Sequence, residues 1–289
     1  MRSMKRVFSS AVLMILFSLF AVREVDAEDR MQAGYASLQF VAEVLGLKAG
    51  EDFQMGIRMS MDPHWHSYWI NPGDSGLATK ISWDMPDGFK ADEIIGPYPH
   101  RVDYETGLTS YTYDGEILFL SRIHVPVHLK REGSVQIKAE VKWLACEKIC
   151  VPGKASIQVS LPMAGGEPTP NPEFAKVFKE KELDYPSAES LWTIEAFEEL
   201  DALRIEILSP KKGEYVLSNI QFFPFRDDLI DHTAKQAATK TEQGYEMIIP
   251  KSIVWSPPVD RLSGLLVADE GWSGPGTHRA LSVNILLKH

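Results

Sequence analysis

The chain has 289 residues, of which 44% are hydrophobic, and 40 acidic against 30 basic residues leave a net charge of −10. A chain this acidic is a poor candidate for binding nucleic acid or an anionic membrane surface. Its length allows one large hydrophobic core or two cores of ordinary domain size.

Residues 1–27 have the pattern of a secretory signal peptide. Basic residues precede an apolar run over residues 7–22, and small residues stand three and one positions before a cleavage after Ala27. A retained membrane anchor is the alternative, but the run is short for a span and serines interrupt it. We therefore expect an exported, soluble protein without stable membrane insertion, whose cysteines meet an oxidising compartment.

Residues 28–162 are predicted to form a β-sandwich. Short runs of alternating polarity, at 53–59, 116–123 and 135–141, are typical of half-buried strands. Turn-forming clusters of glycine, proline and aspartate separate these runs along the chain. Short strands at this spacing favour an antiparallel sandwich.

The segment 163–186 is rich in proline and glycine and is predicted to be a linker. It contains a short predicted helix from Pro172 to Leu183, with Phe174, Val177 and Phe178 on one side. A second strand-rich block without cysteine follows at 187–289. The predicted fold class is all-β, with two β-sandwich domains.

The two cysteines of the chain, Cys146 and Cys150, lie in the stretch WLACEKICVP at 143–152. A disulfide needs its two Cα atoms roughly 4.4–6.8 Å apart, whereas residues four apart in a straight strand are about 13 Å apart. The chain between the cysteines must therefore bend. We expect a strand to end near Leu144 and another to begin near Ala155, with the pair in a tight excursion between them.

The residues by themselves leave two roles open for this pair. A disulfide that closes a loop of five residues stabilises a fold by only about 2 kcal/mol, against nearly 5 kcal/mol for a hundred-residue loop. A disulfide between these two cysteines would therefore stabilise the fold only weakly. A short, exposed disulfide is of the kind that exchanges readily. The spacing is neither the CxxC redox motif nor a zinc-finger pattern. A redox pair and a local structural disulfide are equally compatible with it.

Three stretches carry a resemblance to a known family: WHSYWINPGDSG at 65–76, GLTSY at 107–111 and CEKICVP at 146–152. The sequence resembles the amino-terminal periplasmic domain of DsbD-type and ScsB-type transmembrane thiol:disulfide reductases, and the ScsB-like branch most. The resemblance covers about residues 34–162. The block that begins at Ile220 is similar, less specifically, to the cysteine-free second module of that branch.

This resemblance implies immunoglobulin-like sandwiches and a periplasmic location. It further implies that Cys146 and Cys150 cycle between dithiol and disulfide, in a protein-disulfide reductase component that needs no cofactor. Family members take electrons from a membrane-embedded domain and pass them to thioredoxin-like proteins. Because this chain carries neither the membrane core nor the thioredoxin-like domain, its expected partners are a separate membrane reductase and periplasmic thioredoxin-like proteins; the alternative is that the chain has lost the relay. Which cysteine attacks first is left open.

In the family, a cap loop with an aromatic residue covers the cysteines. The segment 109–115 is the candidate here, with Tyr111 or Tyr113 as the lid. The alternative is an aromatic-rich turn that feeds the core. Within the cysteine loop, Lys148 would favour a thiolate and Glu147 would oppose it.

A second candidate site combines Met59 and Met61 with His64 and His66. Thioether and imidazole ligands suit copper, and ScsB-like proteins are associated with copper tolerance. The favoured interpretation is different: Met55, Met59 and Met61 share strand parity and fill a core face. No metal is therefore expected.

The preferred hypothesis is an exported thiol:disulfide relay protein. The rival hypothesis is a non-catalytic secreted binding module with a structural disulfide, linked to copper tolerance. In the rival case, replacing Cys146 would lower stability by about 2 kcal/mol and would abolish no transfer activity.

Overall fold

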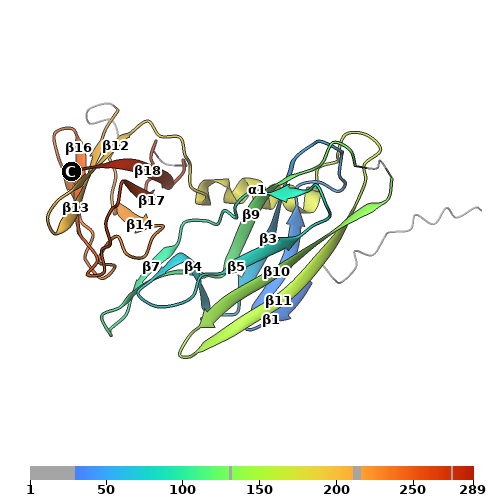
Figure 1. The fold of residues 1–289 in the computed structure, drawn as a ribbon, viewed down its shortest axis with the longest axis horizontal. Helices are drawn as coiled ribbons and strands as arrows, with labels where there is room; N and C mark the ends of the chain where they lie inside the picture. Colours follow the sequence, from blue (N-terminus) through green and yellow to red (C-terminus); the bar gives the residue numbers. More distant parts are fainter. Residues whose placement is uncertain (1–29, 130–131, 211–215, 275) are drawn as a thin grey trace, which may run out of the picture.

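The computed structural model describes residues 30–129, 132–210, 216–274 and 276–289 (Figure 1). The predicted signal peptide lies outside these residues. The described chain is all-β, with three sheets, one α-helix and one short 3-10 helix. We refer to residues 30–162 as the N-terminal region and to residues 187–289 as the C-terminal region.

The N-terminal region contains two sheets. The first has the order β1-β2-β3-β9-β6 and consists of β1 (Arg30–Ala33), β2 (Ala36–Ala42), β3 (Phe53–Met61), β9 (Glu116–His124) and β6 (Lys90–Ala91). The second has the order β11-β10-β4-β8-β7, with β5 paired to β10 as well. Its strands are β11 (Cys150–Pro162), β10 (Ser134–Cys146), β4 (His66–Gly73), β8 (Thr109–Asp114), β7 (His100–Asp103) and β5 (Lys80–Asp84). All the strand pairs of these two sheets are antiparallel.

Inward-facing side chains of the two sheets form one hydrophobic core. On β3, Met55, Ile57 and Met59 are fully buried, and on β10 the buried residues occupy every second position from Val135 to Ala145. Alternation of this kind places one face of each sheet in the core and the other toward solvent. The strands predicted at 53–59, 116–123 and 135–141 are confirmed, and the last is longer than expected.

The segment between the regions forms α1 (Pro172–Lys181) and the 3-10 helix η2 (Glu182–Asp184). Asn171 precedes α1 and Pro172 begins it, a combination that favours a helix start. Phe174 is buried against Val41 and Leu118 of the first sheet. The predicted helix is therefore confirmed, and it is attached to the N-terminal region rather than suspended between two regions.

The C-terminal region contains seven strands in the order β14-β17-β18-β12-β13-β16-β15. They are β14 (Gln221–Pro224), β17 (Arg261–Val267), β18 (Ala280–Lys288), β12 (Thr193–Glu198), β13 (Ala202–Leu208), β16 (Gly244–Pro250) and β15 (Ala238–Lys240). The pairing is antiparallel except between β12 and β18, which run parallel. Ile205, Met247 and Leu266 are among the fully buried residues of its own core.

The two regions share a buried contact. Phe223 of β14 and Leu265 of β17 belong to the core cluster of the N-terminal region, not to the core of their own. The amide of Ser187 donates to the carbonyl of Ala280 at 2.9 Å, which ties the end of the connecting segment to β18.

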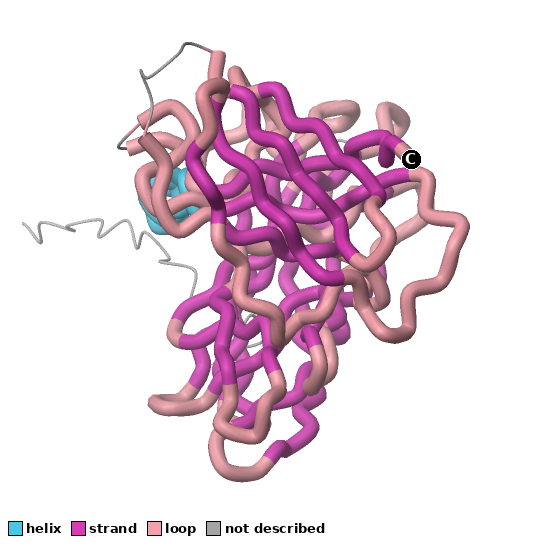
Figure 2. The backbone as a smooth tube through the Cα atoms, turned by 90° about the vertical axis from the view of Figure 1, so that its left-hand side faces the viewer, coloured by secondary structure: helices cyan, strands magenta, loops and turns pink. Residues whose placement is uncertain are grey.

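Figure 2 shows how strands dominate both regions, with α1 at one side. No helix among the described residues is long and apolar enough to span a membrane.

Candidate functional site

Cys146 and Cys150 are joined by a disulfide, and their Cα atoms are 4.1 Å apart. Cys146 is the last residue of β10 and Cys150 the first of β11, and the two lie directly opposite each other in the register. Directly opposed residues in an antiparallel pair come this close at positions without mutual hydrogen bonds. The bend predicted between the cysteines is therefore the three-residue turn 147–149 of a β-hairpin, and both strands extend to the cysteines.

The hairpin register near the disulfide is set by Trp143 and Gly153, which oppose each other. The indole lies so close to Gly153 that a Cβ there would be 2.1 Å from the ring. The indole nitrogen donates to the carbonyl of Gly34 at 3.1 Å, which ties this end of the hairpin to the turn between β1 and β2. The sequence prediction missed these contacts and ended the strand near Leu144.

The disulfide lies on the outer face of the second sheet. Ala145 points into the core, so Cys146, the next residue, projects to the opposite side. Cys146 pairs with His66 of β4, which in turn pairs with Asp114 of β8. Residues that oppose each other across strands share a face, so the row that runs from Cys146 through His66 to Asp114 faces outward.

The two sulfur-bearing residues differ in accessibility. Cys146 is 3% exposed, whereas Cys150 is exposed, as is the whole turn 147–149. Within this turn Ile149 is 64% exposed, so its apolar side chain is available for contact. A protein that approaches the hairpin would therefore reach Cys150 and Ile149 before it reached Cys146.

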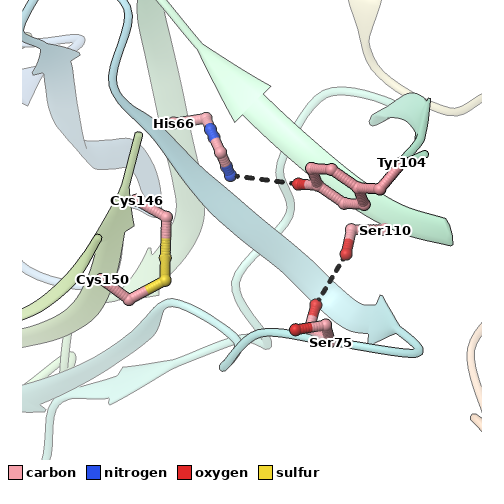
Figure 3. The surroundings of a disulfide bond; sticks show 6 residues. All are labelled: His66, Ser75, Tyr104, Ser110, Cys146 and Cys150. Carbon is pink, nitrogen blue, oxygen red and sulfur yellow. Dashed lines mark hydrogen bonds between the residues drawn. A yellow bond between two sulfur atoms is a disulfide. The ribbon is translucent and has the colours of Figure 1, made fainter. Parts of the chain in front are cut away.

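His66 and Tyr104 lie on the face beside the disulfide (Figure 3). The Nε2 atom of His66 is 3.4 Å from the hydroxyl of Tyr104, and the ring of Tyr68 meets the imidazole edge-on at 5.4 Å. Burial lowers the pKa of His66, opposed by the negative charge of Asp114. Burial also raises the pKa of Tyr68 to about 12. At neutral pH the disulfide therefore has an uncharged imidazole and a protonated phenol beside it.

The loop over residues 74–79, between β4 and β5, also lies on the face beside the disulfide. The loop contacts β4 closely, because a Cβ at Gly76 would be 2.2 Å from the ring of Tyr68. The Ser110 hydroxyl donates to the carbonyl of Ser75 at 2.8 Å (Figure 3). The glycine- and aspartate-rich stretch 71–76 predicted a turn here, but its place next to the disulfide depends on sheet packing.

Tyr111 and Tyr113 do not form the expected lid. Tyr113 pairs with Ser67, one position away from the His66–Asp114 pair, so both tyrosines project from the face opposite Cys146. Tyr113 donates to the carbonyl of Pro97 at 2.6 Å, and Tyr111 packs against Phe223. This corrects the cap assignment: residues 109–114 are a buried strand, and alternation along it directs both phenols inward.

The residues considered for copper lie in different settings. Met59 and Met61 are buried in the core of the N-terminal region, which confirms the favoured interpretation of these side chains. His64 is exposed in the turn before β4, with a φ of +72°, and His66 lies beside the disulfide. Among the described residues, no group of three or more His, Cys, Asp or Glu side chains is arranged to hold a metal ion.

Lys148 and Glu147, the charged residues of the cysteine loop, are both exposed in the turn. Two further lysines, Lys142 and Lys154, lie opposite each other on the outer face and both pair with Glu140. These two ion pairs hold the pKa of Glu140 at about 2. The outer face of the hairpin thus carries lysine side chains although the whole chain is acidic.

Comparison with known proteins agrees with this geometry. Residues 36–162 match the family model described as "Thiol:disulfide interchange protein DsbD, N-terminal". This part of the chain is a DsbD N-terminal domain. The matched segment includes both cysteines, His66, and the 74–79 loop.

Among solved structures, the chain is similar to the N-terminal periplasmic domain of ScsB from Proteus mirabilis. The TM-score is 0.62 at 15% identity, over 87% of this chain and 93% of that one. This likeness extends beyond the DsbD N-terminal domain and shows a shared fold across both regions. The periplasmic chaperone SfaE also matches, with a TM-score of 0.24 and 11% identity over 87% of this chain and 98% of that one. No curated protein matches the chain.

Proposed function

We propose that this protein is an exported thiol:disulfide interchange protein. In this proposal a separate membrane reductase reduces the Cys146–Cys150 disulfide, and the resulting dithiol reduces periplasmic thioredoxin-like proteins. The observation that carries the proposal is the pairing of an exposed Cys150 with a buried Cys146 at the end of a hairpin, within a DsbD N-terminal domain. A disulfide that is accessible at one sulfur suits exchange with a second protein.

The chemistry requires no group beyond the two thiols. The Cys150 thiolate attacks one sulfur of the partner's disulfide, which forms a mixed disulfide and releases the partner's other sulfur as a thiolate. The Cys146 thiolate then attacks the Cys150 sulfur, which restores the Cys146–Cys150 bond and releases the second partner thiol. Two electrons have then moved to the partner, with two protons taken up from solvent by its thiolates. The membrane reductase reverses these steps at Cys146–Cys150 and returns the pair to the dithiol.

The surroundings of the disulfide fit this assignment of roles. The buried cysteine is shielded from stray oxidants, while the exposed cysteine can meet a partner's sulfur in line. The exposed Ile149 beside Cys150 supplies an apolar contact for a docking protein. Burial lowers the pKa of His66, so its imidazole beside the disulfide is uncharged at neutral pH, which lowers the desolvation cost of this side chain when a partner covers it.

The proposal also includes the finer features that the family implies. We assign the 28–162 and 187–289 segments to immunoglobulin-like sandwich domains, with 163–186 as their connection. We also assign the protein to the periplasm, in keeping with its export signal pattern and with the periplasmic origin of the similar ScsB domain.

The deciding measurement is the reduction potential of the Cys146–Cys150 pair, obtained by equilibration in glutathione or dithiothreitol buffers with thiol trapping. We expect a value of about −200 to −270 mV, the range of exchange-active proteins. A value well below about −300 mV would describe a disulfide that stays closed, and the protein would then be a secreted binding module with a structural disulfide.

A further inference from the structure

We propose that the C-terminal region positions the 74–79 loop beside the disulfide, and that Asn71 is the residue through which it does so. This inference rests on the proposed function for its biological meaning. Its structural content concerns the access of thiols to Cys146–Cys150 and is measured separately. It gives a role to a region that carries no cysteine of its own.

Asn71 lies near the end of β4 and is 2% exposed. Its side-chain amide nitrogen donates to two backbone carbonyls of the C-terminal region, Pro224 at 2.8 Å and Arg226 at 3.2 Å. Its side-chain oxygen accepts from the amide of Gly73 at 2.9 Å. One buried amide therefore connects the end of β14 to the backbone just before the 74–79 loop.

From Gly73 the tie continues into the loop through close backbone contacts. A Cβ at Gly73 would be 2.6 Å from the carbonyl oxygen of Thr109, and its φ is +79°, so only glycine fits without strain. The next residue, Asp74, donates its amide to the carbonyl of Thr109 and accepts from the amide of Thr109, each at 2.8 Å. Ser75 then accepts from Ser110. The first half of the loop is thus fixed against β8.

The second half of the loop reaches the disulfide face. Gly76 packs on the ring of Tyr68. Tyr68 is the next outward-facing residue of β4 after His66, and His66 pairs with Cys146. The loop ends at Lys80, which pairs with Lys142 on β10, four residues before Cys146. Displacement at Asn71 would therefore be transmitted along a continuous row of contacts to the face that shields the buried cysteine.

A second set of hydrogen bonds joins the C-terminal region to β8. The hydroxyl of Tyr111 donates to Nδ1 of His232 at 3.0 Å, and Nε2 of His232 donates to the carbonyl of Asp227 at 3.0 Å. Both rings are buried, and burial raises the pKa of Tyr111, so its hydroxyl stays protonated. β8 is the strand on which the 74–79 loop is anchored. The C-terminal region thus fixes the loop from both of its supporting strands.

The test compares Asn71→Ala and Asn71→Asp with the control Arg279→Ala. Aspartate keeps the acceptor for the Gly73 amide but has no donor for the two carbonyls, so it removes the contact between the regions and retains the contact within β4. Arg279 also links the regions, but through the hydroxyl of Tyr98 at 3.3 Å and on an exposed surface. Two quantities are measured on the full chain: amide hydrogen exchange of residues 74–79, and the rate at which dithiothreitol reduces Cys146–Cys150.

We expect both Asn71 variants to exchange the 74–79 amides at least tenfold faster, and to be reduced at least threefold faster, than the wild type and Arg279→Ala. Unchanged rates in a folded Asn71→Asp variant would overturn the inference. Equal acceleration in Arg279→Ala would also overturn it, because the effect would then be general loosening of the interface.

If the Asn71 variants do not fold, Tyr111→Phe decides the question. It keeps the ring and removes the hydroxyl, and the same acceleration at a smaller size is expected. An unaltered Tyr111→Phe protein would then refute the inference. None of these readouts requires a partner protein. Failure of the relay proposal, seen as a potential well below about −300 mV, therefore remains distinguishable from failure of this one.

Discussion

The N-terminal and C-terminal regions both consist of β-strands around a hydrophobic core, but they differ in the groups that they place at their surfaces. Each has antiparallel strands with alternating polarity around a buried core. In the N-terminal region, β10 and β11 run 13 residues each and end in a disulfide on the outer face. The C-terminal region has no cysteine, and β14 and the residues after it pack against β4 and β8.

The N-terminal region thus carries the disulfide, and the C-terminal region supports the strands beside it. In the proposed relay, the cysteine pair needs an edge that a partner can reach, and the end of a long hairpin provides one. The 74–79 loop lies beside this exposed end, and the contacts of Asn71 with the C-terminal region hold the loop in position. A region without reactive groups can thus affect reactivity through the backbone that it holds in place.

The largest expected effect concerns the cysteines themselves. Cys146→Ser and Cys150→Ser should each abolish electron transfer to a thioredoxin-like partner, and each should lower the free energy of unfolding by about 2 kcal/mol. The remaining thiol should differ in access: Cys150 in the first variant should be alkylated rapidly and trapped as a mixed disulfide, whereas Cys146 in the second should react slowly. Alkylation rates and partner trapping check this. Equal rates for the two thiols would contradict the assigned roles.

The second prediction tests how far the regions depend on each other. Phe223 packs with Trp69 and Tyr111 of the N-terminal region, while its neighbour Phe222 points into the core of its own region. We expect each change to alanine to cost about 3–5 kcal/mol. Phe223→Ala should speed hydrogen exchange in β4 and β8, and Phe222→Ala should speed it mainly in the C-terminal region. Identical exchange patterns in the two variants would show that the interface has no separate role.

A third, smaller effect is expected at the turn of the cysteine hairpin. Ile149→Asp should slow transfer to a thioredoxin-like partner by about tenfold, which corresponds to about 1.4 kcal/mol. Reduction of the same variant by dithiothreitol should be unchanged, since the turn does not shield Cys150. Ile253→Asp is the matched control, because Ile253 is fully exposed in the C-terminal region and should leave both rates unaltered. Equal loss of transfer in both variants would place the docking surface elsewhere.

The smallest effect is a pH dependence on the first sheet. His124 lies between the carboxylates of Asp92 and Asp52, and hydrogen bonds to both raise its pKa. A raised pKa in the folded state stabilises the fold below the unfolded value of about 6.5, and this contribution disappears as the pH rises through the folded pKa. The melting temperature of His124→Gln should therefore fall further below that of the wild type at about pH 5.5 than at about pH 9. A difference that does not change with pH would assign the effect to packing instead.

Several elements of the fold could be predicted because their signals are local. Alternation of polar and apolar residues located the strands at 53–59 and 135–141, and the same parity assigned Met55 and Met59 to the core. The spacing of Phe174, Val177 and Phe178 on one side of the stretch located α1. These signals depend on neighbours within a few positions along the chain, so they survive without knowledge of the fold.

The surroundings of the disulfide could not be predicted in the same way. Tyr111 was assigned to the lid because the family resemblance implies an aromatic cap loop and the segment 109–115 was its candidate, but the register between β4 and β8 places this side chain on the inner face. A shift of one residue reverses the face of every side chain in a strand, and the sequence of a single strand does not specify that register. For the same reason His66 was considered for copper rather than for the face of the disulfide.

By itself, the amino-acid sequence determined the β class, the core methionines, the short helix and the cysteine pair with its family, because local periodicity and a short motif carry that information. The tertiary structure alone decided which cysteine is exposed, which side chains lie beside the disulfide and what holds the 74–79 loop. These depend on pairing between distant strands and on contacts such as that of Asn71 with the carbonyl of Pro224, 153 positions further along the chain. Such contacts arise only when two regions pack, and no pattern within either region encodes them.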